Sequence, residues 1–559
     1  MNTALAVPKR LRLLRALLPV LACTALMPRV QAESIDLASA TIADINDAFA
    51  SGALTSEKLV KLYLKRIETY DKQGPKLNTV ITLNTKALEQ ARALDRERKQ
   101  KGPRSPVHGI PIVLKDNYDT FDMPTTAGSS LLKGSIPPDD AYVVKKLREA
   151  GAIILAKVNL SEFASGSGGP NGFSSMGGQT LNPHDLTKGP SGSSGGTGAS
   201  LAAVFAQFGL GTDTGGSVRG PASANGIAGL KPTWGLMSRD GIVPLTLSYD
   251  TGGPMARSVY DVAVALGVMT GVDPNDAATQ NSAGKFETDY TKYLKRGSLQ
   301  GARIGVARDF FKQSVEVDYV MEAAIAQLKA LGATVIDPVN YPDYLLTGRT
   351  AITQAISGRE FKVQLSEYLA TLKPEYPHSL AELIAKAEAP GSGYNNPWRL
   401  NAMKEAQASV GGLDDPQYLV ARNEGLALIK ATVLATFAKH KLDALVYPTS
   451  PKPAQPIAPS TEAAGGVGSA TNIANRTGFP DLIVPAGVTK DGLPVTISFF
   501  GPAFSEPKLL AYGYDFEQAT HARVLPKTTP MLAGETITVT HRAVAARAAP
   551  SQSLAAAAP

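Results

Sequence analysis

Cysteine and histidine are scarce in this chain of 559 residues, and their scarcity removes several kinds of chemistry. Cys23 is the only cysteine, and the six histidines stand singly along the chain. No group of histidine, cysteine and carboxylate residues has the spacing of metal ligands, so we predict no metal site. The sequence lacks a Gly-Lys-Ser/Thr triplet to close a phosphate loop, and Gly209-x-Gly211 lacks the third glycine of a dinucleotide fingerprint. We therefore predict no cofactor.

Acidic residues are absent from the first 32 positions, and most of the excess positive charge lies there. The formal charge of the whole chain is +7, and five of its basic residues fall in this segment. The remaining chain carries 51 basic and 49 acidic residues. A body with so little net charge has no general attraction for phosphate backbones, so we predict no nucleic-acid partner. Hydrophobic residues make up 43% of the chain, which is enough for a large buried core.

The first 32 residues have the pattern of a secretory signal peptide. A basic stretch, Lys9–Arg15, precedes twelve mostly apolar residues at 16–27, and Val30-Gln31-Ala32 fits the small-x-small cleavage pattern. Twelve residues are too few for a membrane span, which needs about 20. We predict cleavage after Ala32, export to the periplasm or the medium, and no integral membrane span. Two alternatives stay open: lipidation of Cys23, whose preceding residues loosely resemble a lipoprotein box, and a buried N-terminal helix.

Short apolar runs alternate with helical patterns in the rest of the chain. Thr41 with Asp44 predicts a capped helix start, and a second helix begins at about Ser56. Strands are predicted at 110–114, 152–156, 210–212, 444–447, 482–484 and 495–500, with a mostly helical middle at 273–430. Such alternation favours an α/β fold with parallel or mixed strands. We predict one large domain at 33–529 and a disordered, Ala-rich tail at 530–559.

Several serine-containing patterns match known hydrolase motifs by letters alone. Gly192-Ser-Ser-Gly-Gly196 fits the G-x-S-x-G elbow centred on Ser194, but the segment before it has the character of a loop rather than a strand. Ser130-Leu-Leu-Lys133 and Ser505-Glu-Pro-Lys508 fit S-x-x-K without the companion S-D-N and K-T-G elements. The Gly/Ser-rich stretch at 165–198 has the composition of a linker. Apolar residues interrupt it, however, and it leads into buried elements.

Lys115 and Ser217 point to nucleophilic catalysis without histidine. Ser217 follows two glycines, which let backbone N–H groups converge on one point as an oxyanion hole. A serine nucleophile needs a base, and the candidate is a lysine held neutral. Lys115 follows five apolar residues, a setting in which burial lowers the pKa of the amine. An ion pair between Lys115 and the adjacent Asp116 accounts for the sequence equally well, and both interpretations stay open here.

Three motifs in order make the chain resemble the amidase signature family. They are Gly109–Asn117, Gly192–Gly196 and Gly211–Arg219. Flanking segments fit as well, namely Gly229–Thr233, Gly241–Pro244, Asp250–Arg257, Asp443–Thr449 and Asp491–Val495. The resemblance covers about residues 40–520. It implies an α/β fold in which a large, mixed and twisted sheet is covered by helices in a single large domain, and amidase activity without metal or cofactor.

The resemblance also assigns roles to residues. It implies Ser217 as the nucleophile, Ser193 as the bridging serine and Lys115 as the base, with a cis peptide between Gly192 and Ser193. It places oxyanion-hole N–H donors at Thr214, Gly215, Gly216 and Ser217, and supporting side chains at Ser194, Asp213 and Arg219. Thr197-Gly198 departs from the usual family pattern, but these two residues lie outside the groups that would take part in the reaction.

The expected substrate follows from resemblance alone. Family members act on several kinds of carboxamide, and three segments look most like bacterial peptide amidases: Gly177–Pro183, Ser238–Ile242 and Ser505–Leu509. We therefore expect a C-terminally amidated peptide as the substrate and ammonia as a product. Alternatives are fatty-acid, aryl or small aliphatic amides. An exported peptide- or solute-binding protein without catalysis is a further alternative, and the oligomeric state is not indicated.

Overall fold

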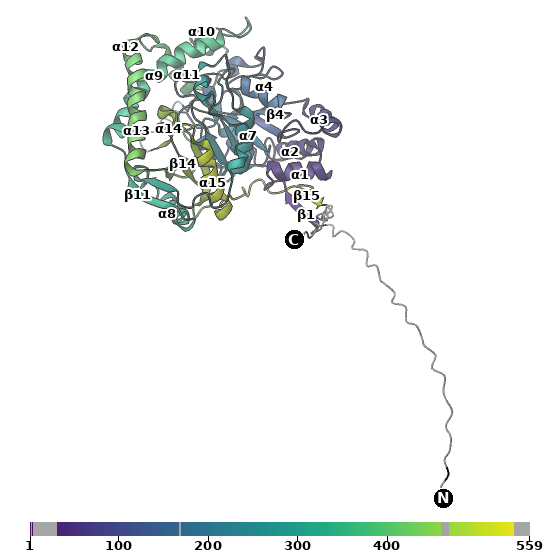
Figure 1. Cartoon of the computed structure of the whole chain (residues 1–559). Coiled ribbons are helices and arrows are strands. Elements are labelled where there is room, and N and C mark those ends of the chain that lie inside the picture. Colours follow the sequence, from purple (N-terminus) through teal and green to yellow (C-terminus); the bar gives the residue numbers. More distant parts are fainter. Residues whose placement is uncertain (2, 4–30, 167–168, 460–468, 542–559) are drawn as a thin grey trace, which may run out of the picture.

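A large β-sheet forms the centre of the protein, whose computed structural model describes residues 1, 3, 31–166, 169–459 and 469–541 (Figure 1). The sheet has 11 strands. In spatial order they are β11 (Thr334–Val339), β10 (Arg303–Ala307), β12 (Ala444–Pro448), β14 (Pro494–Phe500), β13 (Asp481–Val488), β8 (Ala228–Lys231), β9 (Thr251–Ala256), β7 (Phe208–Asp213), β3 (Pro111–Lys115), β4 (Ile153–Val158) and β2 (Val80–Leu83).

The strands of this sheet run in both directions. β11, β10 and β12 are parallel at one side, and β7, β3 and β4 are parallel near the other. The strands between these groups, from β12 through β14, β13, β8 and β9 to β7, pair antiparallel, as do β4 and β2. The prediction of an α/β protein with a large mixed sheet is confirmed.

Helices surround the sheet, and their starts carry recognisable signals. Thr41 and Asp44 form a capping box at the start of the first helix, as predicted. The second helix begins at Ser56 after a Thr55 cap and buries one apolar stripe. The α-helices are α1 (Ile42–Ser51), α2 (Ser56–Tyr70), α3 (Ala87–Lys101), α4 (Tyr142–Glu149), α5 (Gly195–Ala202), α6 (Arg219–Ala224), α7 (Val259–Met269), α8 (Val315–Ala330), α9 (Asp343–Leu369), α10 (Leu380–Glu388), α11 (Pro397–Gln407), α12 (Pro416–Val420), α13 (Leu426–His440), α14 (Thr471–Thr477) and α15 (Glu506–Thr520).

A helical layer made of α9 to α13 lies on one side of the molecule, at the upper left of Figure 1. Side chains from α9, α10 and α11 form a hydrophobic cluster with residues of the loops near the sheet, including Phe163 and Val243. A buried carboxylate adds polar contacts, because Glu162 accepts hydrogen bonds from Tyr394 and Asn396. The layer is therefore packed onto the loops that follow β3 and β4.

The middle of the chain, which we predicted as mostly helical, also contains two strands that we did not predict. β10 and β11 lie within 273–430 and extend the sheet at one edge. β11 is the edge strand, and most of its residues are partly or fully exposed. An exposed edge strand does not need an apolar run, so its sequence carries no strong strand signal. The Gly/Ser-rich stretch also has defined structure, with a short hairpin of β5 (Phe173–Ser174) and β6 (Gly178–Gln179).

The two ends of the described chain meet in a second, two-stranded sheet. β1 (Gln31–Asp36) pairs antiparallel with β15 (Thr536–His541). Ile537 and Val539 are buried in the main core. The prediction of disorder from residue 530 is therefore wrong as far as His541, because these few apolar residues have a partner strand about 500 positions away. Residues 542–559 and most of the predicted signal peptide lie outside the described residues. Within the described chain, no helix combines the length and the apolar character needed to cross a bilayer.

Candidate active site

Lys115 lies at the end of β3, beside the end of the parallel strand β7. The register pairs Leu114 with Leu210, so Lys115 and Thr212 meet at the same sheet edge. The Nζ atom of Lys115 lies 2.7 Å from Oγ1 of Thr212 and 2.7 Å from Oγ of Ser193. Burial lowers the pKa of Lys115 to about 7, and the charges of Asp213 and Asp250 oppose part of that shift. A large fraction of the amine is therefore neutral near pH 7 and able to accept a proton.

Asp116 pairs with a different lysine. Its Oδ1 lies 3.4 Å from Nζ of the buried Lys157, and its Oδ2 accepts a hydrogen bond from the hydroxyl of Thr126. Burial raises the pKa of Asp116 and lowers the pKa of Lys157. The interpretation of Lys115 as the ion-pair partner of Asp116 is therefore wrong, and the interpretation as a desolvated base is the one that the geometry supports.

Ser193 is held in place by its own backbone. The peptide between Gly192 and Ser193 is cis, as the resemblance implies. The Ser193 carbonyl accepts a hydrogen bond of 2.9 Å from the N–H of Ser161. A side chain at Gly192 would come within 2.6 Å of the Ser161 hydroxyl and of Asn171, so only glycine fits there. The Ser193 hydroxyl accepts the hydrogen bond from Lys115.

Ser217 lies on the turn between β7 and α6, and α14 supports this turn from one side. Three side chains of α14 donate hydrogen bonds to three successive carbonyls of the turn: Asn475 to Asp213 (3.1 Å), Arg476 to Thr214 (3.0 Å) and Thr471 to Gly215 (3.2 Å). In a trans peptide the N–H points opposite to the C=O, so the N–H groups of Thr214 and Gly215 point away from α14. The Ser217 hydroxyl has no hydrogen-bond partner among the described residues.

Asp213 and Arg219 tie the base of this turn together. Arg219 donates to both carboxylate oxygens of Asp213 at 3.0 Å and reaches Asp481 at 2.7 Å. Both partners are fully buried. The Arg219 guanidinium and other donors hold the pKa of Asp213 well below its usual range against the effect of burial, and the paired carboxylates raise the pKa of Arg219. Their predicted supporting role fits this arrangement.

One predicted oxyanion-hole donor is already used within the turn. The N–H of Gly216 donates to Oδ1 of Asp213 at 2.8 Å. Gly216 has a φ of 124°, and a side chain there would come within 2.8 Å of the Thr471 hydroxyl. Only glycine therefore fits at this position. Gly216 therefore shapes the turn rather than offering a free donor, which corrects our prediction. The N–H groups of Thr214, Gly215 and Ser217 remain as donors.

The competing serine motifs are occupied elsewhere. The Ser194 hydroxyl is buried and bonds to the backbone N–H and C=O of Thr212, which suits a support and not a nucleophile. Lys508 of the second S-x-x-K pattern forms a salt bridge of 2.8 Å with Asp443. Lys133 of the first pattern is exposed. Within the described residues, no cluster of three or more histidine, cysteine or carboxylate side chains is arranged to hold a metal ion.

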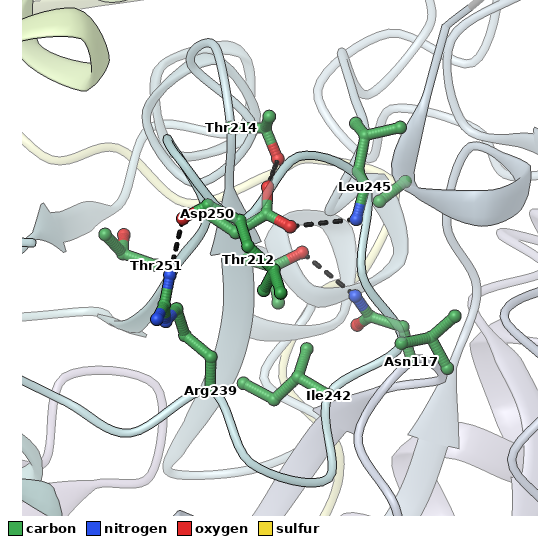
Figure 2. A pocket seen from close by; sticks show the side chains of 11 residues that line it. Asn117, Thr212, Thr214, Arg239, Ile242, Leu245, Asp250 and Thr251 are labelled. Atoms are coloured by element: carbon green, nitrogen blue, oxygen red, sulfur yellow. Dashed lines mark hydrogen bonds between the residues drawn. The ribbon is translucent and has the colours of Figure 1, made fainter. Parts of the chain in front are cut away.

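A small pocket lies beside Asn117 and Thr212, and Thr212 is one of the two hydroxyl partners of Lys115 (Figure 2). Its apolar wall includes Ala164, Ile242, Val243, Leu245 and Leu247, and its polar lining includes Asn117, Thr212, Thr214, Asp250 and Thr251.

The charges at this cavity are engaged by neighbouring groups. Arg239, which also lines it, pairs with Asp276 and donates to the Leu247 carbonyl. Asp250 accepts from the hydroxyl of Thr214 and from the N–H of Leu245. The pocket is therefore mainly apolar, and its two charged side chains are bonded to neighbouring groups.

Comparison with known proteins decides the family. A family model described as Amidase matches residues 58–510, which is most of the chain. The chain belongs to the amidase family. A probable amidase of Arabidopsis thaliana is 37% identical to it over 504 residues, spanning 88% of this chain and 92% of the relative. A glutamyl-tRNA(Gln) amidotransferase subunit of Thermoanaerobacter pseudethanolicus is 35% identical over 503 residues, spanning 88% and 99%.

Solved structures agree with this amidase in fold. The native peptide amidase of Stenotrophomonas maltophilia is 40% identical, has a TM-score of 0.81, and is matched over 88% of this chain and 99% of its own. A peptide amidase in complex with the competitive inhibitor chymostatin is 41% identical, also with a TM-score of 0.81, over 87% and 99%. The protein is thus an amidase, a hydrolase of amide C–N bonds, with the single-domain fold that we predicted.

Sequence reasoning missed several residues that shape the site of this amidase. Asn117, Asp250 and Thr251 lie inside motifs that carried the family resemblance, so their positions were visible but their roles were not. Thr212 ends a strand that we predicted, and in the fold this strand pairs with the strand that ends at Lys115. Pairing these two strands from the sequence would have placed Thr212 near Lys115. The side chains of α14 carry no local signal, because their partners lie more than 250 residues earlier in the chain.

Proposed function

We propose that this amidase works through Ser217, Ser193 and Lys115 and that its substrates are peptides with a C-terminal carboxamide. The observation that supports the catalytic proposal most is the buried contact of 2.7 Å between Lys115 and Ser193. It joins a lysine with a lowered pKa to the bridging serine, and Ser194 N–H bonds to the Ser217 carbonyl at 3.2 Å, which holds the two serine loops together.

The reaction begins with proton transfer toward the lysine. Neutral Lys115 accepts the proton of Ser193 as Ser193 accepts the proton of Ser217, and Oγ of Ser217 attacks the carboxamide carbon. The negative charge that develops on the carbonyl oxygen is stabilised by N–H groups of the turn, with Gly215 and Ser217 as the proposed donors. Ser193 then gives a proton to the leaving nitrogen and recovers one from Lys115, and ammonia departs as the C–N bond breaks.

Hydrolysis of the acyl-enzyme repeats these steps with water. Water loses a proton through Ser193 to Lys115 while its oxygen attacks the acyl carbon, and Ser217 leaves with its proton restored. The net change is one amide and one water converted to one carboxylic acid and one ammonia. No step needs a metal or cofactor. The substrate proposal is supported by the likeness to two peptide amidase structures at 40% and 41% identity.

Ammonia release by matched variants tests both proposals. We expect the chain from Glu33 to release ammonia from a short peptide amide and Ser217→Ala to reduce kcat/KM by more than about 1000-fold, because removing a nucleophile removes the covalent route. A serine-reactive phosphonate should label the parent and not the variant. Glutamine, a fatty-acid amide and an aryl amide serve as comparison substrates. Labelling without release from peptide amides would contradict only the substrate. Full activity of Ser217→Ala would contradict the mechanism, and a protein that neither reacts nor is labelled would be a binding protein.

We also propose that the protein is exported after cleavage at Ala32. The basic and apolar segments before Ala32 support this proposal. Cleavage there leaves Glu33–Asp36 of β1, which pair with Thr536–Val539 of β15. The exported chain has no cysteine and therefore no disulfide bond.

A further inference from the structure

Arg476 of α14 is a buried arginine that contacts no carboxylate in the described part of the chain. Its side chain makes three contacts: Nη1 donates to the Thr214 carbonyl at 3.0 Å, Nε donates to the Thr353 hydroxyl at 2.9 Å, and the guanidinium lies 3.9 Å from the centre of the Tyr249 ring. Burial lowers the pKa of Arg476, but arginine keeps its proton in proteins. A buried positive charge with neutral partners therefore lies on the α14 side of the turn that carries Ser217.

The carboxylates near Arg476 are bonded to other groups. Asp213 and Asp250 act on its charge through space. Arg219 donates to both oxygens of Asp213, and Asp250 accepts hydrogen bonds from the Thr214 hydroxyl and from two backbone N–H groups. The group of the turn that the Arg476 guanidinium contacts directly is therefore the carbonyl of Thr214.

The Thr214 carbonyl belongs to the same peptide as the N–H of Gly215. In a trans peptide these two groups point in opposite directions, so this N–H points away from α14. It donates to no acceptor in the described residues, whereas the N–H of Gly216 is taken by Asp213. A hydrogen bond to the carbonyl of a peptide polarises that peptide and strengthens its N–H as a donor, and a charged donor has the larger effect. Arg476 therefore acts on an N–H that is free to bind an oxyanion.

The two other α14 side chains that bond to this turn are neutral. Asn475 donates to the carbonyl of Asp213, and Thr471 donates to the carbonyl of Gly215. The peptide that Thr471 contacts carries the N–H of Gly216, which is already used within the turn. Of the three successive peptides that α14 supports, the one between Thr214 and Gly215 thus combines a charged donor on its carbonyl with a free N–H.

We propose that Arg476 is a positioning residue for the oxyanion: its charge fixes and polarises the Thr214–Gly215 peptide and makes the Gly215 N–H the strongest donor to the oxyanion. This inference rests on the proposed function, in which Ser217 attacks the carboxamide carbon. Negative charge develops on the carbonyl oxygen in the transition state and not in the bound substrate. The effect of Arg476 is therefore expected in kcat rather than in KM.

Three substitutions separate the charge of Arg476 from its hydrogen bond. Arg476→Lys keeps the charge, Arg476→Gln keeps a neutral N–H donor, and Arg476→Met removes both. We expect the Gln and Met variants to lower kcat for a peptide amide by about 10-fold or more with KM within about twofold of the parent, and the Lys variant to keep most of the parental kcat. Arg523→Met is the matched control, because burial also lowers the pKa of Arg523, which donates to the Ala38 carbonyl before α1. We expect its kcat to equal that of the parent.

The ionisation of a bound hemiketal supplies a readout that a merely structural role would not move. A peptidyl trifluoromethyl ketone forms a bond between its carbonyl carbon and Oγ of Ser217, the serine proton passes through Ser193 to Lys115, and the ketone oxygen takes the place of the oxyanion. Nuclear magnetic resonance of an isotopically labelled carbonyl carbon follows the protonation of that oxygen. We expect its pKa to rise by about one pH unit or more in Arg476→Gln and Arg476→Met and to stay at the parental value in Arg476→Lys and Arg523→Met.

Unchanged kcat and hemiketal pKa in Arg476→Gln would overturn the proposal, as would a higher KM with the parental kcat. A loss in Arg476→Lys as large as that in Arg476→Met would also contradict it, because the charge is then not the cause. Arg476→Gln carries the test if Arg476→Met does not fold. Adduct formation by the parent and its loss in Ser217→Ala check the proposed function separately. If the parent forms no adduct at Ser217, the proposed function fails and this inference fails with it.

Discussion

At the scale of single residues, the proposed mechanism depends on one buried amine, that of Lys115. Lys115 is fully buried, its hydrogen-bond partners are two neutral hydroxyls, and the carboxylates that influence its pKa, Asp213 and Asp250, are bonded to other groups. An ion pair with either carboxylate would keep the amine protonated and useless as a base. Arg219 and Thr214 occupy these carboxylates instead.

We expect the pH dependence of the reaction to follow the protonation of Lys115. The pKa of Lys115 is lowered to about 7, and the neutral form is the active one in the mechanism that we propose. We therefore expect kcat/KM to fall about tenfold for each pH unit below about 7 and to level off above it. Steady-state rates measured across the pH range in which the protein stays folded test this expectation. Lys115→Met is the inactive control. A rate that does not change across pH 7 would show that another group is the base.

At the scale of elements, a buried ion pair joins α2 to the segment before β15. Arg66 contacts Glu535 at 2.8 Å, with both side chains 1% exposed. Arg66 also donates to the carbonyls of Thr529 and Ala203. Ala203 is the C-cap of α5, the helix that begins directly after Ser193 and Ser194. The Arg66 guanidinium therefore connects the C-terminal segment to the helix that follows Ser193.

Removing the carboxylate of this pair should be costly. We expect Glu535→Ala to lower the free energy of unfolding by about 3 kcal/mol, because it leaves the charge of Arg66 buried without a counter-ion. Thermal melting measures the effect. Glu68→Ala is the matched control, since Glu68 pairs with Lys65 on the exposed face of the same helix, and exposed pairs contribute little. Equal melting temperatures for the two variants would contradict the importance of the buried pair.

At the scale of the whole molecule, the chain closes on itself. β1 and β15 pair across almost the full length of the sequence, and Ile537 and Val539 pack into the same core as α1 and α2. β1, which begins at Gln31, can pair with β15 only after the C-terminal part of the chain has been synthesised. The proposed cleavage after Ala32 would remove the first two residues of β1 and keep the other four pairs.

The mature N-terminus tests the export proposal. We expect the full chain, expressed in a Gram-negative host, to be recovered from the periplasm with Glu33 as its first residue, as the small-x-small pattern directs. Mass spectrometry of the fractionated protein makes the measurement. Cys23→Ser should give the same N-terminus. An acylated Cys23 at the new N-terminus would instead show a lipoprotein, and an intact Met1 in the cytoplasm would contradict export.

The sequence by itself determined the local parts of this protein. Apolar runs indicated the strands that end at Lys115 and near Thr212, because buried strands must be hydrophobic over their whole length. The Thr41 cap and the stripe of α2 follow from hydrogen bonds and contacts between residues three or four positions apart. The motifs around Lys115, Ser193 and Ser217 indicated an amidase, since each needs particular residues side by side.

Only the tertiary structure decided which of these parts meet. The sequence left two interpretations of Lys115 open, a desolvated base and an ion-pair partner of Asp116. In the fold Asp116 pairs with Lys157, because the pairing of β3 with β4 brings that lysine close to it. The donor role of Gly216 was wrong because the carboxylate of Asp213 takes its N–H. The support of the turn by α14 and the closure by β15 depend on contacts between distant residues. Local sequence cannot specify such contacts, because their energy exists only after the chain has folded.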